Sequence, residues 1–297
     1  MTAPTANDPP MAQEPASEQF TLDMPAEESI GTPVPGFDPS VPSPARMYDY
    51  YLGGKDHFPA DREAAEVALS VVPFGREVAR ANRLFMVRAV QFMASSGIGQ
   101  FIDLGTGLPA RPNVHRVARE ILPDARVLYV DNDPMACAHA RALLATNDGV
   151  AAIYGDIRAP QAILCDPVTC TLIDFTRPVG VLLVAVLHFL TDKERPWEQV
   201  AAFRWRMASG SMLAVSHITS EGTPPDVQET IRDVYAEATA PAVFRTPQEI
   251  EAFFGRLDLV EPGLVEVGAW RSLHPSPLAP LRFLGGVACL TPEGGQS

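Results

Sequence analysis

Three acidic residues and two glycines at the ends of successive predicted strands could bind a nucleoside. Asp103, Gly105 and Gly107 lie at the end of the first of these strands, Asp131 ends the second, and Asp156 follows the third. Glycines at such a turn let the backbone approach a ligand without a Cβ in the way. A carboxylate at the end of the second strand can accept hydrogen bonds from both hydroxyls of an adenosine ribose. The pattern therefore predicts an adenosine-containing ligand.

Two classes of nucleoside fit this loop. Residues 105–110, GTGLPA, satisfy the dinucleotide fingerprint, so a nicotinamide-dependent oxidoreductase is one option. A pyrophosphate at the loop would meet the like charge of Asp103, and Pro109 lacks the N–H that a diphosphate would use. S-adenosylmethionine (SAM) has no phosphate and carries a sulfonium and an ammonium. The electrostatics of the loop therefore favour SAM.

Predicted strands and helices alternate along the chain, and together they would position these residues. Short apolar runs predict strands, and apolar residues at steps of three and four predict helices. Asp133 and Thr246, each followed by proline, are typical of helix starts. The predicted strands cover 99–105, 125–131, 150–155, 179–187, 211–218, 263–270 and 283–290, and the predicted helices cover 60–71, 77–95, 113–121, a segment from Pro134, 195–208, 225–239 and 247–254.

This order of elements predicts an α/β fold. The apolar run 179–187 suits a central parallel strand covered by helices on both faces. The last two strands have no convincing helix between them, which indicates an antiparallel pair. We therefore expect a doubly wound, mostly parallel, seven-stranded Rossmann-like sheet that ends in an antiparallel hairpin. A helical N-terminal extension over 46–97 would precede it within one domain, 46–297.

The first 45 residues differ in composition from the rest. They hold ten of the 29 prolines and seven acidic residues with no basic one, so we expect a disordered tail over 1–45. The whole chain has 23 Lys+Arg against 36 Asp+Glu, a net charge of −13, which disfavours a nucleic-acid partner.

Several classes of protein are disfavoured by what the sequence lacks. The four cysteines, at 137, 165, 170 and 289, have no spacing typical of a metal site, and no metal is expected. The N-terminus has no signal-peptide pattern, and the longest apolar run is too short to span a membrane. We therefore expect a cytoplasmic protein without a membrane partner.

Longer motifs resemble a known family. The series Asp103-Leu-Gly105-Thr-Gly107, Asp131 and Gly155-Asp156-Ile157 resembles class I SAM-dependent methyltransferases. Five strings within residues 44–271 resemble, more specifically, the bacterial S-adenosyl methyltransferase family best known from actinomycetes. They are ARMYDYYLGGKDHF (45–58), GLPARPNVH (107–115), YVDNDPMACAHARALL (129–144), VLLVAVLHFLTD (181–192) and EPGLVEVGAWR (261–271). Ala110 departs from the threonine that the family pattern leads us to expect.

The resemblance implies roles for the loops after the first two strands. Asp103, Gly105 and Gly107 would shape the pocket for the methionine part of SAM, with Asp103 acting on the ammonium or a water. Asp131 would hold the ribose, and Asn132 would lie beside the adenine.

It also implies roles for the two following loops. Asp156 would accept a hydrogen bond from the adenine amino group, and the backbone N–H of Ile157 would bind N1. Val186 and Leu187 would line the pocket near the sulfonium.

The segment before the sheet is expected to close over the cofactor. Tyr48, Gly53 and Gly54 belong to this family-specific piece. His188 follows the fourth predicted strand, where it could act as a general base or be a buried structural histidine.

The acceptor is left largely open by the sequence. We expect a small molecule with an O, N or S nucleophile, and loops 46–60 and 219–245 would select it. The aromatic residues Tyr48, Tyr50, Tyr51, Phe58 and Tyr235 favour an apolar or aromatic acceptor. A non-catalytic SAM-binding protein is a further alternative. The chain could also form a homodimer.

Overall fold

The computed structural model describes residues 37–145, 149–274 and 279–291. These residues form an eight-stranded sheet with the order β3-β2-β1-β4-β5-β8-β6, and β7 pairs with β8. Strands β1 to β5 are parallel, and β8 runs antiparallel to β5, β6 and β7. The strands are β1 (Gln100–Leu104), β2 (Arg126–Asp131), β3 (Val150–Tyr154), β4 (Gly180–Val184), β5 (Met212–Thr219), β6 (Asp258–Leu259), β7 (Val265–Glu266) and β8 (Arg282–Cys289).

The doubly wound fold predicted from the sequence is confirmed, with one more strand than expected. The predicted strand 263–270 keeps only the two residues of β7, and β6 is a separate short strand before it. Pro262 lies between them and has no N–H for a sheet hydrogen bond, and Gly263 has a φ of +87°. Strand β6 lies before the predicted segment and was not predicted, and the proline and glycine separate it from β7.

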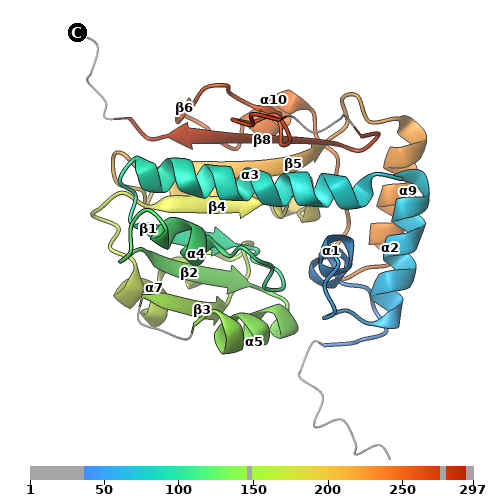
Figure 1. The fold of residues 1–297 in the computed structure, drawn as a ribbon, viewed down its shortest axis with the longest axis horizontal. Coiled ribbons are helices and arrows are strands. Elements are labelled where there is room, and N and C mark those ends of the chain that lie inside the picture. The colour runs from blue at the N-terminus through green and yellow to red at the C-terminus, as the bar shows by residue number, and fades with distance from the viewer. Residues whose placement is uncertain (1–36, 146–148, 275–278, 292–297) are drawn as a thin grey trace, which may run out of the picture. The chain divides into compact units, whose positions relative to one another are not determined.

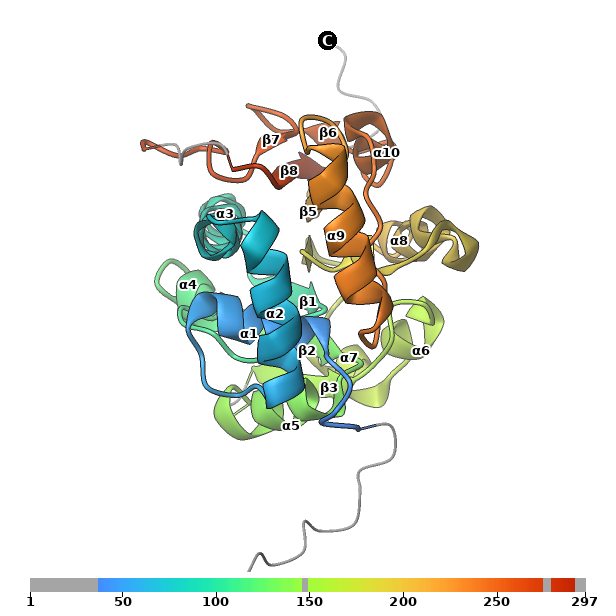
Figure 2. The ribbon, with the colours of Figure 1, turned by 90° about the vertical axis from the view of Figure 1, so that its right-hand side faces the viewer.

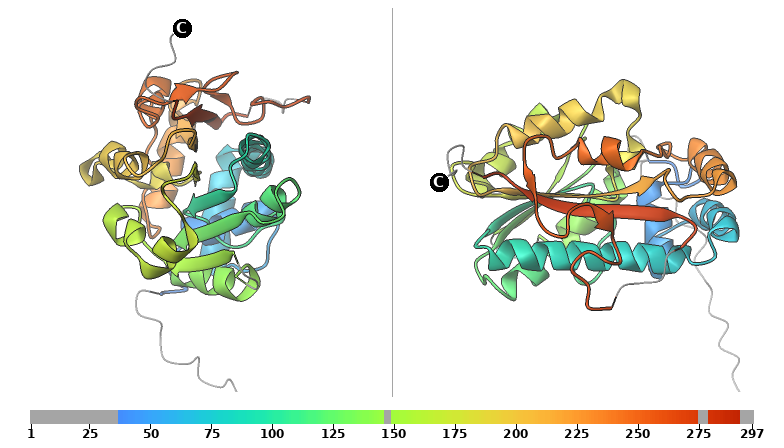
Figure 3. Two further views of the ribbon diagram at one scale, coloured as in Figure 1. Left: turned by 90° about the vertical axis from the view of Figure 1, so that its left-hand side faces the viewer. Right: turned by 90° about the horizontal axis from the view of Figure 1, so that it is seen from above.

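Helices cover both faces of the sheet, as Figures 1 and 3 show. Alternate strand residues point to opposite faces, so Phe101 and Val127 pack with the α3 side while Ile102 and Leu128 pack with the α8 side. Helices α3 (Gly75–Ser95), α4 (Val114–Arg119) and α5 (Pro134–Leu143) lie on the first side, and α6 (Pro160–Leu164), α7 (Pro167–Leu172), α8 (Pro196–Arg204) and α10 (Pro247–Glu251) lie on the second.

Two predicted helix starts are confirmed by their side-chain caps. Asp133 accepts hydrogen bonds from the backbone N–H groups of Met135 and Ala136, at 2.8 and 3.2 Å. Thr246 caps α10 together with Glu249. Both caps satisfy N–H groups that the first turn of a helix leaves without a partner. None of the described helices combines the length and apolar character needed to cross a membrane.

Strand β4 ends three residues before the predicted end at 187. Ala185 takes a left-handed conformation with φ +57°, and Leu187–Phe189 forms a short 3-10 helix, η1. The N–H of Ala185 donates to the Ser216 hydroxyl at 2.9 Å, which fixes the bend. The chain therefore leaves β4 three residues earlier than its apolar pattern indicates.

A helical layer made of α1 (Pro44–Leu52), α2 (Pro59–Val71) and α9 (Pro225–Ala236) lies across the carboxyl ends of the parallel strands (Figure 2). The sequence predicted α2 and α9, but it did not resolve α1 as a helix. Helix α1 begins at Pro44, before the expected start of the domain at residue 46.

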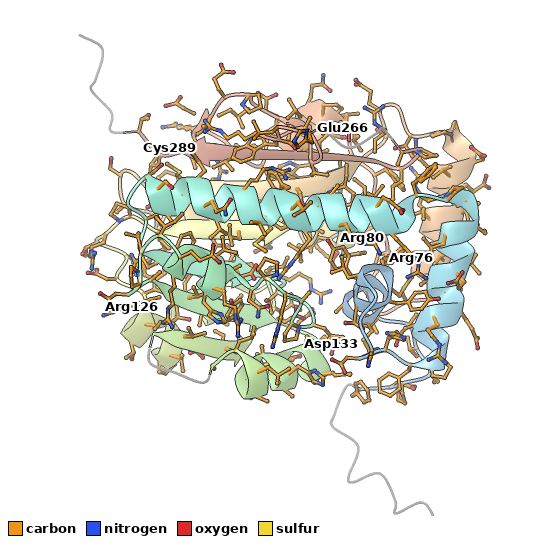
Figure 4. All side chains as sticks on the ribbon, viewed as in Figure 1. Arg76, Arg80, Arg126, Asp133, Glu266 and Cys289 are labelled. Carbon is orange, nitrogen blue, oxygen red and sulfur yellow. The ribbon has the colours of Figure 1, made fainter. Side chains whose placement is uncertain are left out.

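The predicted tail over 1–45 therefore ends too late, because residues 37–45 belong to the folded part. The backbone N–H of Ser43 donates to Asp61 at 2.8 Å, and its hydroxyl donates to Asp133 at 2.7 Å. In Figure 4, Asp133 lies between α5 and α1. The part of the predicted tail over 1–36 lies outside the described residues.

A buried ion pair joins these elements. The Nε of Arg46 lies 2.9 Å from Asp61 Oδ2, and both side chains are almost fully buried. Arg46 Nη1 also lies 3.6 Å from Asp133 Oδ2, at the start of α5. Asp61 accepts further hydrogen bonds from the backbone N–H groups of Ser43 and Phe58. The pair thus fixes the helical layer to the sheet domain.

Replacing Asp61 with alanine should lower the free energy of unfolding by about 3–5 kcal/mol, because Arg46 would remain buried without its charge partner. Chemical denaturation measures this change. Glu63→Ala, which removes an exposed carboxylate from the same helix, is the matched control and should change stability by less than about 0.5 kcal/mol. Similar small losses in both variants would show that the ion pair does not hold the layer in place.

Candidate active site

A cavity of about 410 Å³ opens at the carboxyl ends of the parallel strands. It is lined by the loops after β1, β2, β3 and β4, and the helical layer and α3 close it from outside. Strand order reverses between β1 and β4, and in open α/β sheets such a reversal leaves a crevice in which ligands bind. The cavity therefore lies where the sequence placed the nucleoside.

Asp131 organises the loop that follows β1. One carboxylate oxygen accepts the backbone N–H of Gly107 at 2.7 Å, and the other accepts that of Asp133 at 2.8 Å. Gly105 has a φ of +72°, and a Cβ there would lie only 2.3 Å from Val186. The loop after β4 thus packs directly on the glycine turn, which explains why this position needs glycine.

Asp103 lies beside Asp131 in the same buried environment. Thr106 donates a hydrogen bond to it at 3.1 Å. Burial raises the pKa of Asp103 to about 6, although the positive charge of Arg83 and the Thr106 hydrogen bond work in the opposite direction. Burial likewise raises the pKa of Asp131 to about 6 against its two backbone hydrogen bonds. Two carboxylates at one site, only partly neutralised, make it a good place for a cation.

Asp156 is held differently, by a guanidinium. Arg158 binds both of its oxygens, with Nε–Oδ1 and Nη2–Oδ2 distances of 2.9 and 2.7 Å. Asn132 lies 3.3 Å from the same carboxylate, and Arg158 also reaches Glu194 at 3.0 Å. Burial opposes ionisation of Asp156, but the hydrogen bonds from Arg158 outweigh it and lower its pKa. This carboxylate therefore stays charged.

His188 lines the cavity from the loop after β4, as predicted. Its Nδ1 is buried and has no hydrogen-bond partner in the described part of the chain. Burial, together with the nearby His217 and Arg245, holds its pKa well below the usual range, so the ring is neutral at physiological pH.

Arg245 holds the loop after β4 in place from the protein core. It is buried, and it donates hydrogen bonds to the carbonyl oxygens of Leu187 and Leu190 at 3.0 and 2.8 Å. Its Nη1 lies 2.9 Å from Nε2 of His217, which is structural rather than part of the cavity lining.

Three predicted site residues lie outside the cavity lining. Leu187 is 1% exposed and packs in the core on the α8 side, because the 3-10 turn directs it away from the cavity. Gly53 ends α1 with φ +83°. A Cβ on Gly54 would lie 1.9 Å from a carboxylate oxygen of Asp49. The two glycines therefore shape a turn, and none of the three is placed to contact a cofactor.

The other predicted site residues all line the cavity. Tyr48 does so from α1, while its hydroxyl donates to the Ala79 carbonyl and accepts from Asn82, both at 3.0 Å. The remaining lining residues from the prediction are Asp103, Gly105, Gly107, Asp131, Asn132, Asp156, Ile157, Val186 and His188.

Sequence reasoning missed Asn82, Arg83 and Arg158. Asn82 is 1% exposed and accepts a hydrogen bond from Ser216 at 2.6 Å. Arg83 donates to the carbonyls of Ala110 and Pro112, and its buried Nε has no partner in the described chain. A polar residue next to the apolar stripe of the helix predicted over 77–95 was the available signal for Asn82.

Comparison with known proteins identifies the family. The S-adenosyl methyltransferase family model matches residues 31–290. The chain belongs to this family. A candidate methyltransferase from Thermobifida fusca has 41% identity and a TM-score of 0.81, and the match covers 87% of this chain and 98% of that one. A DUF574 family protein from Streptomyces avermitilis has 37% identity and a TM-score of 0.80, over 86% of this chain and 99% of that one. No curated protein matches the sequence.

The protein is therefore a SAM-dependent methyltransferase. The residues present fit this cofactor, because Asp103 near the end of β1 and Asp131 at the end of β2 offer carboxylates to a sulfonium and an ammonium. The nicotinamide alternative, which the glycine pattern left open, is not what the family uses. Among the described residues, no group of three or more His, Cys, Asp or Glu side chains could hold a metal ion.

SAM binding should weaken as the pH falls through about 6, because the two positive charges of SAM, its ammonium and its sulfonium, favour ionised Asp103 and Asp131. In the free protein, these raised pKa values stabilise the fold below pH 3.8, and that contribution is lost as the pH rises through about 6. Calorimetric titration should show the Kd of SAM rising as the pH falls below about 6. The rise should be up to about tenfold per pH unit for each carboxylate that must lose a proton on binding.

S-adenosylhomocysteine is the matched control ligand, since it keeps the ammonium and lacks only the sulfonium charge. Its affinity should depend less on pH than that of SAM, and Asp103→Asn, which removes the carboxylate assigned to the ammonium, should reduce the dependence for both ligands. A SAM affinity that does not change between neutral pH and pH values below 6 would contradict this account of the two carboxylates.

Proposed function

We propose that this methyltransferase transfers the methyl group of SAM to an O, N or S nucleophile of a small molecule bound in the same cavity. The observation that carries the proposal is the composition of that cavity. Its lining joins buried carboxylates after β1 and β2 to a histidine and aromatic side chains after β4 and on α9. One enclosed space thus offers surfaces of two chemistries, one for the cofactor and one for an acceptor.

The cofactor would lie along the ends of β1, β2 and β3. Asp103 is suited to the ammonium of SAM, and the positive charge of Arg83, which lines the cavity and acts on Asp103, is suited to the carboxylate. Asp131 would accept the ribose hydroxyls with the lone pairs that its two backbone hydrogen bonds leave free.

The adenine would lie between the loops after β2 and β3. Asn132 lines that side, and Asp156 would share its carboxylate between the adenine amino group and Arg158. The backbone N–H of Ile157 would donate to N1. Val186, packed on Gly105, would face the sulfonium from the loop after β4.

Methyl transfer needs alignment more than acid–base chemistry. A lone pair on the acceptor attacks the methyl carbon, the C–S bond breaks, and its electron pair stays on sulfur, leaving neutral S-adenosylhomocysteine. Holding the two reactants in line in a closed cavity supplies much of the lowering of the barrier. Where the nucleophile enters protonated, the neutral ring of His188 is placed to take that proton.

We propose that the protein works in the cytoplasm, without a nucleic-acid partner. Cys137, Cys165, Cys170 and Cys289 are free thiols, as expected in a reducing compartment. The net charge of −13 would repel a phosphate backbone.

Asp131→Ala should weaken SAM binding by about 1.5–3 kcal/mol, the usual loss when a hydrogen bond to a charged group is removed. Isothermal titration calorimetry measures the change, and circular dichroism checks that the variant is folded. Asp124→Ala is the control. It removes an exposed carboxylate just before the amino end of β2, away from the cavity, and should leave the affinity for SAM unchanged. A wild-type affinity for SAM in the Asp131 variant would show that the ribose does not bind at Asp131.

A further inference from the structure

The charged side chains that line the cavity are gathered on one side of it. They come from the segment before α2, from α3, and from the loops after β1, β2 and β3. They are Asp38, Arg46, Arg83, Asp103, Asp131, Asp133, Asp156 and Arg158. This side accounts for the cofactor and for the ion pairs that hold the helical layer, so the acceptor must use the other.

The opposite side carries no charged side chain among the described lining residues. We call it the uncharged wall and define it by Tyr51, Leu69, His188, Phe189, Ile231, Tyr235 and Phe283. These residues come from α1, α2, η1, α9 and β8, and Figure 2 shows α1, α2 and α9 in front of the strands.

Aromatic rings form most of this wall in a continuous series. The ring of His188 lies 5.5 Å from that of Phe283 and 4.3 Å from that of Phe189. Phe189 in turn lies 5.4 Å from Tyr235. Such a surface binds a flat ring well through stacked and edge-to-face contacts.

The polar groups of the wall are also uncharged. Burial raises the pKa of both Tyr51 and Tyr235, that of Tyr235 to about 12, and each hydroxyl influences the pKa of the other. The neutral ring of His188 completes the set. Arg76 and Glu66 act on Tyr51 and Arg245 acts on His188, but none of these three charged residues lines the cavity. An ionic acceptor would therefore lose its hydration here without direct contact with a counter-charge, whereas a neutral hydroxyl, amine or thiol would find hydrogen-bond partners.

We infer that the methyl acceptor is an uncharged, flat aromatic molecule that binds against the uncharged wall. The inference rests on the proposed function, since it assigns the substrate class of the same cavity. It commits to a neutral acceptor, and anionic or cationic aromatic molecules are outcomes that would overturn it.

The test compares three probes with one ring system and different charge. Wild-type protein saturated with S-adenosylhomocysteine is titrated calorimetrically at neutral pH with 2-naphthol, 2-naphthoate and 2-(aminomethyl)naphthalene. We expect 2-naphthol to bind at least about tenfold more tightly than either ion, because only the ions lose hydration without compensation. Equal or tighter binding of either ion would overturn the inference.

A matched pair of variants locates the binding. Leu69→Trp fills the cavity from α2 and should weaken 2-naphthol binding at least about tenfold by removing space, with no change for S-adenosylhomocysteine. Val67→Trp adds the same ring to the exposed side of that helix, where Val67 is 50% exposed, and should change neither affinity. Undiminished 2-naphthol binding to the Leu69 variant would also overturn the inference.

The two levels of proposal fail in different ways. If S-adenosylhomocysteine itself does not bind to the wild-type protein, the cofactor site and the proposed function are wrong. If it binds and none of the three naphthalenes does, the function stands and the aromatic acceptor is wrong. The comparison among wild-type titrations does not depend on any variant folding.

Discussion

The incomplete neutralisation of two buried carboxylates is the constraint around which this site is built. Parallel strands place their carboxyl ends at one edge, so Asp103 and Asp131 lie together once β1 and β2 pair. Backbone N–H groups, Thr106 and the charge of Arg83 compensate part of the burial, yet the pKa of both acids remains near 6. A ligand that brings positive charge completes the compensation, whereas a diphosphate would add to the unfavourable charge.

The helical layer turns this charged edge into an enclosed site. Helices α1, α2 and α9 contribute apolar side chains such as Met47, Ala65 and Ile231 to the hydrophobic core on the α3 side. The buried pair of Arg46 and Asp61 joins α1 to α2, and the link from Arg46 to Asp133 connects them to the start of α5. Asp133 thus caps α5 and anchors the layer at once. The division of the cavity into a charged side and an uncharged wall follows from this docking.

The loop after β4 connects the two sides. It bends at Ala185, places Val186 against Gly105, and turns His188 and Phe189 toward the acceptor side. Arg245 holds the carbonyl groups of this loop from the core, and its guanidinium lies over the ring of Trp197. Arg245, which does not line the cavity, therefore fixes the loop that carries Val186 and His188.

The sequence by itself determined the features that depend on neighbouring residues. The order of strands and helices, the caps at Asp133 and Thr246, and the placing of Asp103, Asp131 and Asp156 at strand ends follow from local periodicity and spacing. The motifs were specific enough to predict the family and its cofactor.

Only the tertiary structure decided which residues face the cavity. Leu187 points into the core because Ala185 bends the chain. Gly54 lacks a side chain because the Asp49 carboxylate occupies that space, and not because a ligand does. Arg83 and Arg158 join the site from α3 and the loop after β3 through contacts with distant segments. Burial, charge balance and the direction of a side chain depend on contacts between segments far apart in the chain, and local sequence patterns do not encode these contacts.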